Sequence, residues 1–318
     1  MTCAFHAGER AVQARVGVAE RMAEVGPRVL RDFMPEQHRT FFAQLPFVVM
    51  GSVDSDAQPW VSALAGPPGF VSTPDAAQLR VRALPAASDP MTRSLAVGAA
   101  IGLLGIEPHT RRRNRANGTV SAVDGGGFTL HVEQSFGNCP KYIQAREPQY
   151  VGTASTMPQA VMHARLDHSG QKMVQAADTF YISTAHPQHT AHGDRSHGVD
   201  VSHRGGKPGF VRLDIDAGGQ QWLTVPDFSG NYYFNTLGNV QLHPQAGLLF
   251  IDFDSGDLWH VAVQAEIVWD AAELARYAGA QRLLRMQVRQ VLHRPAALPL
   301  RWGAAELSPA LGATGTWT

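Results

Sequence analysis

The stretch VSHRGGKPGFV (residues 201–211) repeats the earlier stretch VSALAGPPGFV (residues 61–71) at an offset of 140 residues (201 minus 61). A second pair of stretches, GLLGIE (102–107) and GLLFID (247–252), repeats at an offset of 145 residues (247 minus 102). The two offsets differ by five residues (145 minus 140), a difference that insertions in surface loops produce between copies. Because the period is far longer than that of a solenoid repeat, the pattern predicts a duplicated domain.

Short runs rich in valine and aromatic residues surround both pairs and alternate with turn residues, which is typical of antiparallel β-sheets. Helical periodicity predicts helices over residues 8–25, 157–177 and 271–294. We therefore expect a mainly β protein with flanking helices, of the α+β class. Two similar units packed about a pseudo-two-fold axis would cover their open sheet edges and form a cleft between them.

The length of 318 residues favours at least two domains, because a single hydrophobic core rarely grows to this size. The expected divisions are an N-terminal helical segment (1–40), a first β-unit (41–156), a second β-unit (157–270) and a closing helix and strand (271–318). The second β-unit is expected to carry most of the binding site.

The composition excludes several classes of protein. Lysine and arginine number 27 and are balanced by 27 acidic residues, so no overall charge draws the chain to nucleic acid or to an anionic membrane. The two cysteines, Cys3 and Cys139, are too few for a disulfide scaffold and are expected to be free thiols. No signal peptide or membrane span is evident, and a cytoplasmic location is predicted.

The turn of the second copy combines cations with small residues. It contains five candidate site residues: His203, Arg204, Gly205, Gly206 and Lys207. Backbone N–H groups at a Gly-Gly pair, together with a guanidinium and an ammonium group, are the chemistry of a phosphate-binding turn. A charged hairpin turn without a ligand is the alternative. The first copy keeps the turn but has no charge at residues 63–67, which favours one retained anion site over two.

Two further segments carry candidate binding residues. Asn231, Asn235 and Asn239 recur at every fourth position among aromatic residues, which suits a planar ligand, although asparagine also favours simple turns. In FGNCPKYIQAR (136–146), Pro140 is expected to begin a short helix that faces an anion, beside Lys141. Cys139 is more easily explained as a structural thiol than as a nucleophile.

Two other clusters invite functional interpretations. Five histidines lie in one segment: His186, His189, His192, His197 and His203. They leave open a metal-binding or haem-binding loop, although a surface loop is the simpler interpretation and no metal ligand is assigned. The arginines of PHTRRRNRANG (108–118) invite a nucleic-acid interpretation, but a solvated hairpin tip is favoured.

Taken together, FGNCPKYI, SHRGGKPGFV, LGNVQLHPQAGLLFID and HVAVQAEIVWD resemble the pyridoxamine 5′-phosphate oxidase-like FMN-binding split-barrel family in its tandem form, over about residues 40–302. The resemblance implies two six-stranded Greek-key split barrels packed as an intramolecular pseudo-dimer that holds FMN between them. It implies that the phosphate contacts the 203–207 turn, and that Asn231, Asn235 and Asn239 approach the flavin. Asn138 and Lys141 would reach in from the first unit.

The same resemblance implies an FMN-dependent oxidoreductase. The phosphate-ribityl signature of the true pyridoxamine phosphate oxidases is missing, so that specific activity is not expected. The expected partner is a small-molecule substrate or electron donor, with NAD(P)H among the candidates, and a homodimer is left open. A flavin-binding or phosphate-binding module without turnover is the alternative from another class.

Overall fold

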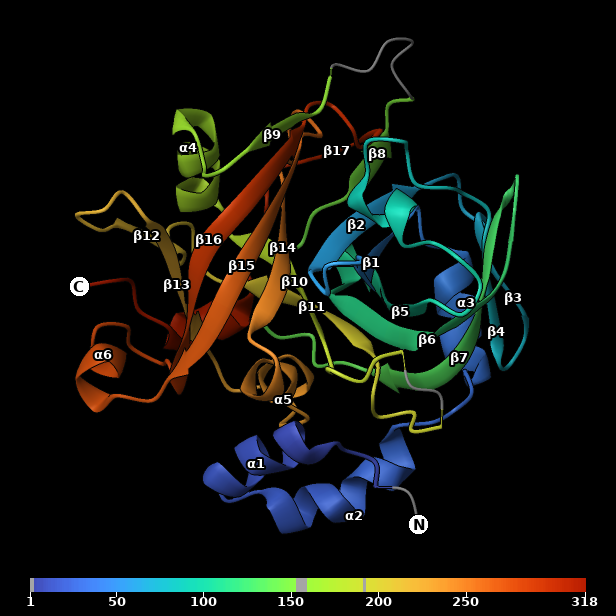
Figure 1. Ribbon diagram of the computed structural model, residues 1–318, viewed down its shortest axis with the longest axis horizontal. Helices are drawn as coiled ribbons and strands as arrows, with labels where there is room; N and C mark the ends of the chain where they lie inside the picture. The colour runs from blue at the N-terminus through green and yellow to red at the C-terminus, as the bar shows by residue number, and fades with distance from the viewer. Residues whose placement is uncertain (1–2, 153–158, 191–192) are drawn as a thin grey trace.

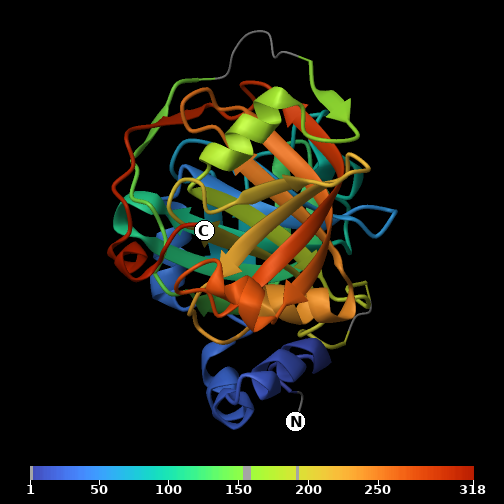
Figure 2. The same ribbon diagram turned by 90° about the vertical axis from the view of Figure 1, so that its left-hand side faces the viewer.

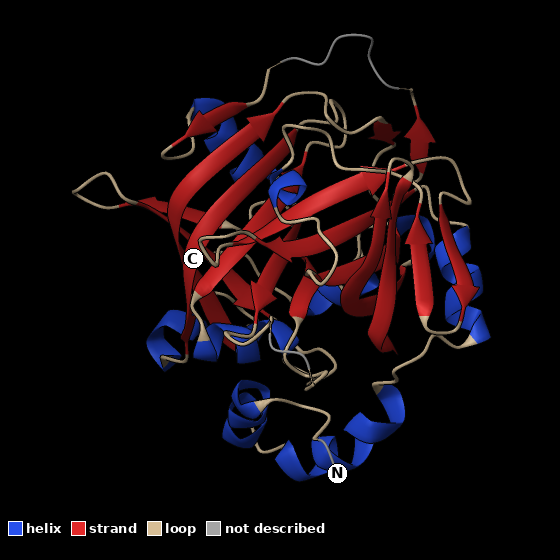
Figure 3. Cartoon of the chain, turned by 45° about the vertical axis from the view of Figure 1, so that its right-hand side comes forward, coloured by secondary structure: helices blue, strands red, loops and turns tan. Residues whose placement is uncertain are grey.

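The computed structural model describes residues 3–152, 159–190 and 193–318. The chain is mainly antiparallel β, with two large sheets side by side and helices at the periphery (Figures 1 and 3). Neither sheet closes on itself within the described residues, because the strand path of each begins and ends at an unpaired edge. In the same residues, every helix is too short or too polar to cross a membrane.

The first sheet has seven strands in the order β2-β1-β5-β6-β7-β4-β3. Their bounds are β1 Phe47–Val53, β2 Pro59–Ala65, β3 Val71–Asp75, β4 Gln78–Val81, β5 Ala100–Glu107, β6 Arg112–Asp124 and β7 Gly127–Gly137. One face of the sheet packs on helix α3 (Glu36–Ala43), whose Phe41 and Phe42 are fully buried in the core of this unit.

The second sheet repeats this order as β11-β10-β14-β15-β16-β13-β12, with β9 added beside β16. The bounds are β9 Val161–His163, β10 Thr179–Ala185, β11 Val199–Gly205, β12 Arg212–Ile215, β13 Gln221–Asp227, β14 Gln245–Ile251, β15 Leu258–Val268 and β16 Arg282–Arg294. Strands β8 (Pro148–Tyr150) and β17 (Leu300–Trp302) form a separate pair. The repeated stretches of sequence lie on equivalent strands, β2 with β11 and β5 with β14.

The remaining helices are α1 (Ala7–Arg15), α2 (Ala19–Val29), α4 (His168–Ala176), α5 (Asn235–Leu242) and α6 (Ala271–Ala275). The predicted helix over 8–25 is thus two helices, separated by a turn at residues 16–17. Helix α1 packs beneath α5 at one end of the molecule and α2 lies beside α1, while α4 lies across the outer face of the second sheet (Figure 2). Three short 3₁₀ helices, η1 (Pro90–Arg93), η2 (Pro108–Thr110) and η3 (Pro309–Ala313), complete the described elements.

The prediction of a long helix over 271–294 is wrong. Only residues 271–275 are helical, and 282–294 form β16, which pairs with β15 on one side and β13 on the other. Leu284, Met286 and Val288 are buried while Arg285 is exposed, an alternation with the period of a strand. Tertiary pairing on both sides decided between two periodicities that the sequence allows.

The helix predicted over 157–177 is shorter than expected. Residues 157 and 158 lie outside the described residues, 161–163 form β9, and α4 begins only at His168. Asp167 caps this helix, because its carboxylate accepts the Gly170 N–H at 2.8 Å.

The two sheets share a core where they meet. The first sheet contributes Phe47, Val49, Val61 and Leu104, and the second contributes Tyr181, Val201, Leu249 and Leu258. The backbones approach closely at two equivalent positions: a Cβ on Gly102 would lie 2.7 Å from the Val199 carbonyl oxygen, and one on Gly247 2.2 Å from that of Pro59. Only glycine permits these approaches, so the two sheets meet in a nearly symmetric way.

Candidate functional site

A cleft of about 120 Å³ lies where the two sheets and α5 meet. Its walls come from β6 of the first sheet, the segment 138–142, β11 of the second sheet, and the segment 226–237 that ends in the first turn of α5. Ligand pockets usually have volumes of about 300–1,000 Å³. The enclosed part of this cleft can therefore hold one end of a ligand, and the rest of the ligand would lie at the open mouth of the cleft.

Seven of the ten predicted site residues line this cleft: Asn138, Lys141, His203, Arg204, Gly205, Asn231 and Asn235. They come from parts of the chain that are far apart in sequence, and Asn231 Nδ2 donates to Asn138 Oδ1 across the cleft at 3.4 Å. Gly206, Lys207 and Asn239 do not line it. Lys207 Nζ donates instead to the Thr314 carbonyl at 2.5 Å, and the buried Asn239 donates to Thr184 Oγ1 at 3.1 Å.

The Gly-Gly pair serves packing within the protein. A Cβ on Gly205 would lie 2.0 Å from the Tyr142 carbonyl oxygen, and one on Gly206 would overlap the Phe210 side chain. The Gly206 N–H donates to the Asp178 carbonyl. These contacts within the protein account for both glycines, so no ligand is needed to explain them.

Arg204 is less available than its sequence context indicates. Its guanidinium pairs with the buried Asp227 carboxylate, which Arg282 also approaches at 3.3 Å. Arg282 in turn lies over the ring of Phe234, 4.9 Å from its centroid. The charge of Arg204 is thus partly compensated inside the protein, because it shares Asp227 with Arg282, and its Nε has no hydrogen-bond partner among the described residues.

Arg113 and Arg115, both on β6, are the main wall residues that the sequence interpretation missed. Arg113 Nε donates to the Cys139 carbonyl at 2.8 Å, and its Nη1 donates to His203 Nδ1 at 3.2 Å and to the His203 carbonyl at 3.3 Å. Within the described residues, no carboxylate lies within 4 Å of this guanidinium. Burial and the neighbouring arginines lower the pKa of Arg113 to about 10, so it remains charged at neutral pH.

Arg115 is only 5% exposed and forms the floor of the cleft. It pairs with Asp200, donates to Ser202 Oγ, and donates from Nη1 to Asn235 Oδ1 at 3.2 Å. The prediction that the 108–118 arginines form a solvated tip is therefore wrong for Arg113 and Arg115. The signal was their spacing of two residues on a strand, which places both side chains on one face.

His203 lies beside the arginines of the cleft and is itself neutral. Burial, followed by Arg113 and Arg204, holds the pKa of this imidazole well below its usual range. Because Nδ1 accepts from Arg113, the ring proton lies on Nε2. The site can therefore offer a charged guanidinium, an ammonium at Lys141 and amide groups to an anionic ligand.

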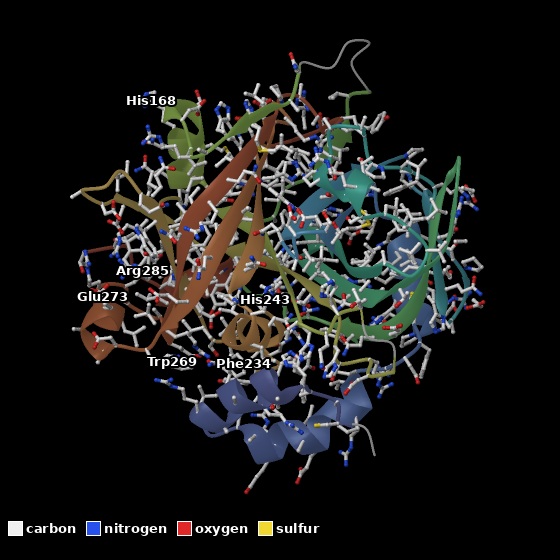
Figure 4. The ribbon with its side chains drawn as sticks, viewed as in Figure 1. His168, Phe234, His243, Trp269, Glu273 and Arg285 are labelled. Carbon is white, nitrogen blue, oxygen red and sulfur yellow. The ribbon has the colours of Figure 1, made fainter. Side chains whose placement is uncertain are left out.

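Three aromatic residues of the wall have strained backbones. Tyr142, Tyr232 and Phe234 have φ angles of 66°, 64° and 61°, in the left-handed region that bulky side chains rarely adopt. Figure 4 labels Phe234 at the level of α5, above the N-terminal helices. Such strain concentrates at binding sites, where surrounding packing holds it in place.

The histidine-rich segment does not form a metal site in the part of the chain that the structure describes. The rings of His186 and His197 stack at 3.8 Å, and His6 meets His186 edge-on at 5.0 Å. No group of three metal-binding side chains converges there or elsewhere among the described residues. His192 lies outside those residues, and His203 faces the cleft instead.

Glu9 of α1 lies just behind the cleft and is 3% exposed. Its Oε1 accepts from Asn235 Nδ2 at 2.5 Å and its Oε2 accepts from the His6 N–H at 2.8 Å. Burial is the main reason that the pKa of Glu9 is raised to about 8, and the Asp200 carboxylate adds to the shift.

We expect Glu9→Gln to stabilise the protein at alkaline pH. The folded-state pKa of Glu9 is raised above its ordinary value of 4.5. The contribution of protonated Glu9 to the free energy of unfolding is therefore fully present below pH 4.5 and is lost as pH rises through about 8. The thermal midpoint of the variant minus that of the unmodified protein should therefore be larger at pH 9 than at pH 5. An equal difference at both pH values would contradict the assignment.

Three comparisons relate the chain to known proteins. A family model described as pyridoxamine 5′-phosphate oxidase matches residues 34–159, and no curated protein matches. Among solved structures, HupZ from Group A Streptococcus is 12% identical, with 39% of this chain and 90% of that one covered, at a TM-score of 0.29. HutZ from Vibrio cholerae, titled a heme storage protein, is 13% identical (41% and 95% covered, TM-score 0.25).

A putative pyridoxamine 5′-phosphate oxidase from Corynebacterium glutamicum is 12% identical, with 42% of this chain and 97% of that chain covered, at a TM-score of 0.25. The matched segment 34–159 contains α3 and the whole of the first sheet. Over this segment the chain is similar to the pyridoxamine 5′-phosphate oxidase family, and the second sheet lies outside the match.

Proposed function

We propose that the chain is an FMN-binding flavoprotein made of two duplicated split-barrel units, and that it acts as an oxidoreductase. The duplication is supported by the identical strand orders of the two sheets and by the two sequence repeats on equivalent strands. The close approaches at Gly102 and Gly247, which are 145 residues apart, support a pseudo-two-fold packing.

The observation that carries the binding proposal is the uncompensated charge of Arg113. Arg113 is half-buried in the wall, and a partly desolvated cation that no carboxylate approaches among the described residues gains from an anionic partner. Further unsatisfied donors belong to residues of the same walls: Arg115 Nε, Arg204 Nε and Asn138 Nδ2. The phosphate of FMN would supply both charge and acceptor oxygens.

The donor set fits the anionic end of FMN, and the aromatic residues at 142, 228, 232 and 234 suit a flat ring system. Bound FMN would supply hydride or electron transfer, and this chain would bind and orient it. Arg113 and Lys141 would hold the phosphate, while Asn138, Asn231 and Asn235 would offer amide groups to the rest of the cofactor.

A single site is supported by what occupies the equivalent position of the other unit. Arg115 and Ser202 correspond to His260 and Ser62 at the offsets of 145 and 140. There, His260 Nδ1 donates to the Val61 carbonyl at 2.7 Å, and Ser62 Oγ donates to Asp89, which pairs with Arg294 at 2.5 Å. The buried ion pair of Asp89 and Arg294 therefore occupies the position that is equivalent to the open cleft.

Haem binding in the same cleft is the second candidate. It is favoured by His203, a buried neutral imidazole in the wall, because a neutral imidazole is a common axial ligand of haem iron. A flavin carrier without turnover is the third interpretation.

We expect the purified protein to bind FMN with a stoichiometry near one, measured by quenching of flavin fluorescence. NADH or NADPH should bleach the bound flavin, and air should restore its absorbance. If the protein does not bind FMN but gives a Soret band with hemin, the proposal is overturned in favour of haem binding. If the protein binds FMN but neither NADH nor NADPH reduces it, the interpretation as a flavin carrier is favoured.

A further inference from the structure

Helix α1 delivers Glu9 to the back of the cleft through a tight helix crossing. A Cβ on Gly8 would lie 2.1 Å from the Gly238 carbonyl oxygen, and one on Gly238 would lie 2.5 Å from Glu9 Cγ. The two glycines therefore allow α1 and α5 to cross closely enough for Glu9 to reach Asn235, the first residue of α5. The N-terminal segment is thus part of the site's support, although it lies outside both sheets.

A continuous hydrogen-bonded path joins Glu9 to the floor of the cleft. Glu9 Oε1 accepts from Asn235 Nδ2, and Asn235 Oδ1 accepts from Arg115 Nη1 at 3.2 Å. Both Asn235 and Arg115 line the cleft, whereas Glu9 does not. The carboxyl group can therefore act on a ligand only through these two side chains and through its charge.

The charged and titratable groups that face Glu9 come from four parts of the chain. They are His6 beside α1, Arg115 of β6, Asp200 of β11, and, beyond His6, the group of His186, Asp194 and His197. His6 and His186 are neutral at pH 7, because burial lowers the pKa of His6 to about 3 and that of His186 to about 4. Arg115 is the arginine of this set, and it already pairs with Asp200.

We propose that Glu9 is a positioning residue for the anionic ligand of the cleft: when its carboxyl group is protonated, Asn235 and Arg115 are free to receive the anion, and when it is ionised it opposes binding. This inference rests on the proposed function. A protonated Oε1 needs an acceptor, which favours rotation of the Asn235 amide so that its Oδ1 faces Glu9. One N–H of Arg115 Nη1 then loses its acceptor and becomes available to the ligand, while Asp200 and Ser202 continue to hold the guanidinium in place.

The proton on Glu9 also removes a negative charge from a poorly solvated region. With Glu9 ionised, Glu9 and Asp200 face one arginine, so the floor of the cleft carries a net charge of −1. With Glu9 protonated the floor is neutral, and an anion no longer meets this repulsion. Linkage requires that the anion in turn favours the protonated form of Glu9.

The test is a fluorescence titration of the full-length protein with FMN at pH 7 and at pH 9. The phosphate group, with a second pKa of about 6, is mostly ionised at pH 7 and completely ionised at pH 9. We expect the Kd of the unmodified protein to rise roughly fivefold or more between these pH values, as typical coupling energies allow. In Glu9→Gln the rise should be less than about twofold. Glu20→Gln, which removes an exposed carboxylate from the neighbouring α2, is the matched control and should behave like the unmodified protein.

A second variant, Asn235→Ala, keeps Glu9 but removes the amide that joins it to Arg115; it should bind FMN more weakly and with a smaller pH dependence. Carbon-13 NMR of the Glu9 carboxyl group should show its pKa rising when FMN is added. If the unmodified protein and Glu9→Gln show the same pH dependence of FMN binding, the proposed role of Glu9 is overturned, while the proposed function is not. Absence of FMN binding at both pH values in every folded form overturns the proposed function itself.

Discussion

Replacing Arg113 by alanine is expected to weaken FMN binding by about 1.5–3 kcal/mol, the usual range for a hydrogen bond to a charged group. Arg113 is the wall cation whose charge no carboxylate compensates within the described residues, so an anion gains most from it. Isothermal titration calorimetry with FMN measures the loss directly. The folded state should be retained, because removing Arg113 leaves no buried carboxylate without a partner.

Two neighbouring arginines serve as comparisons. Arg204→Ala should lose less affinity than Arg113→Ala, since Arg204 already has a carboxylate partner in Asp227 and Arg113 has none among the described residues. Arg112→Ala changes the adjacent residue of β6, which is exposed and lies over the ring of Phe41, and it should leave FMN affinity nearly unchanged. If Arg112→Ala and Arg113→Ala weakened binding equally, the cleft could not be the anion site.

Asp89→Asn is expected to lower the free energy of unfolding by about 3–5 kcal/mol, because it leaves the buried Arg294 without a counter-charge. The side chains of Asp89 and Arg294 are 1% and 4% exposed, and their closest atoms are 2.5 Å apart. The pair joins the segment before β5 to β16 of the other unit, so its loss also weakens the contact between the two units. Urea denaturation measures the change.

The exposed pair of Arg39 and Glu36 provides the control for this prediction. Glu36 is 79% exposed in its side chain, and such surface pairs contribute little to stability. Glu36→Gln should therefore leave the urea midpoint unchanged. A similarly small effect of Asp89→Asn would mean that water, rather than the protein, solvates Arg294 in the folded state.

Two sheets with the same strand order agree with the repeats at residues 61–71 and 201–211, which lie on β2 and β11. Strands β2 and β11 follow from local alternation and turn residues, which depend on a few neighbouring positions. The helix predicted over 271–294 failed for the opposite reason: β16 is a strand because β15 and β13 pair with it, and both pairings are set by the tertiary fold.

The candidate site divides in the same way. The residue types and spacing in 203–207, 231–239 and 138–141 predicted an anion-binding cleft, and seven of the ten named residues line a single cleft. Whether that cleft binds an anion stays a prediction. Residue types alone could not show which cations are already paired. The sequence favoured Arg204 as the phosphate ligand, but Asp227, 23 positions further along the chain, lies against it.

The sequence by itself therefore determined most of the strands and the residue types that meet at the cleft, since strand patterns and turn residues act locally. Only the tertiary structure decided that Arg113 is uncompensated, that Asp89 and Arg294 fill the equivalent position, and that Glu9 lies behind Asn235. The physical reason is that charge compensation depends on distances of a few ångströms between residues that are far apart along the chain, and packing alone sets those distances.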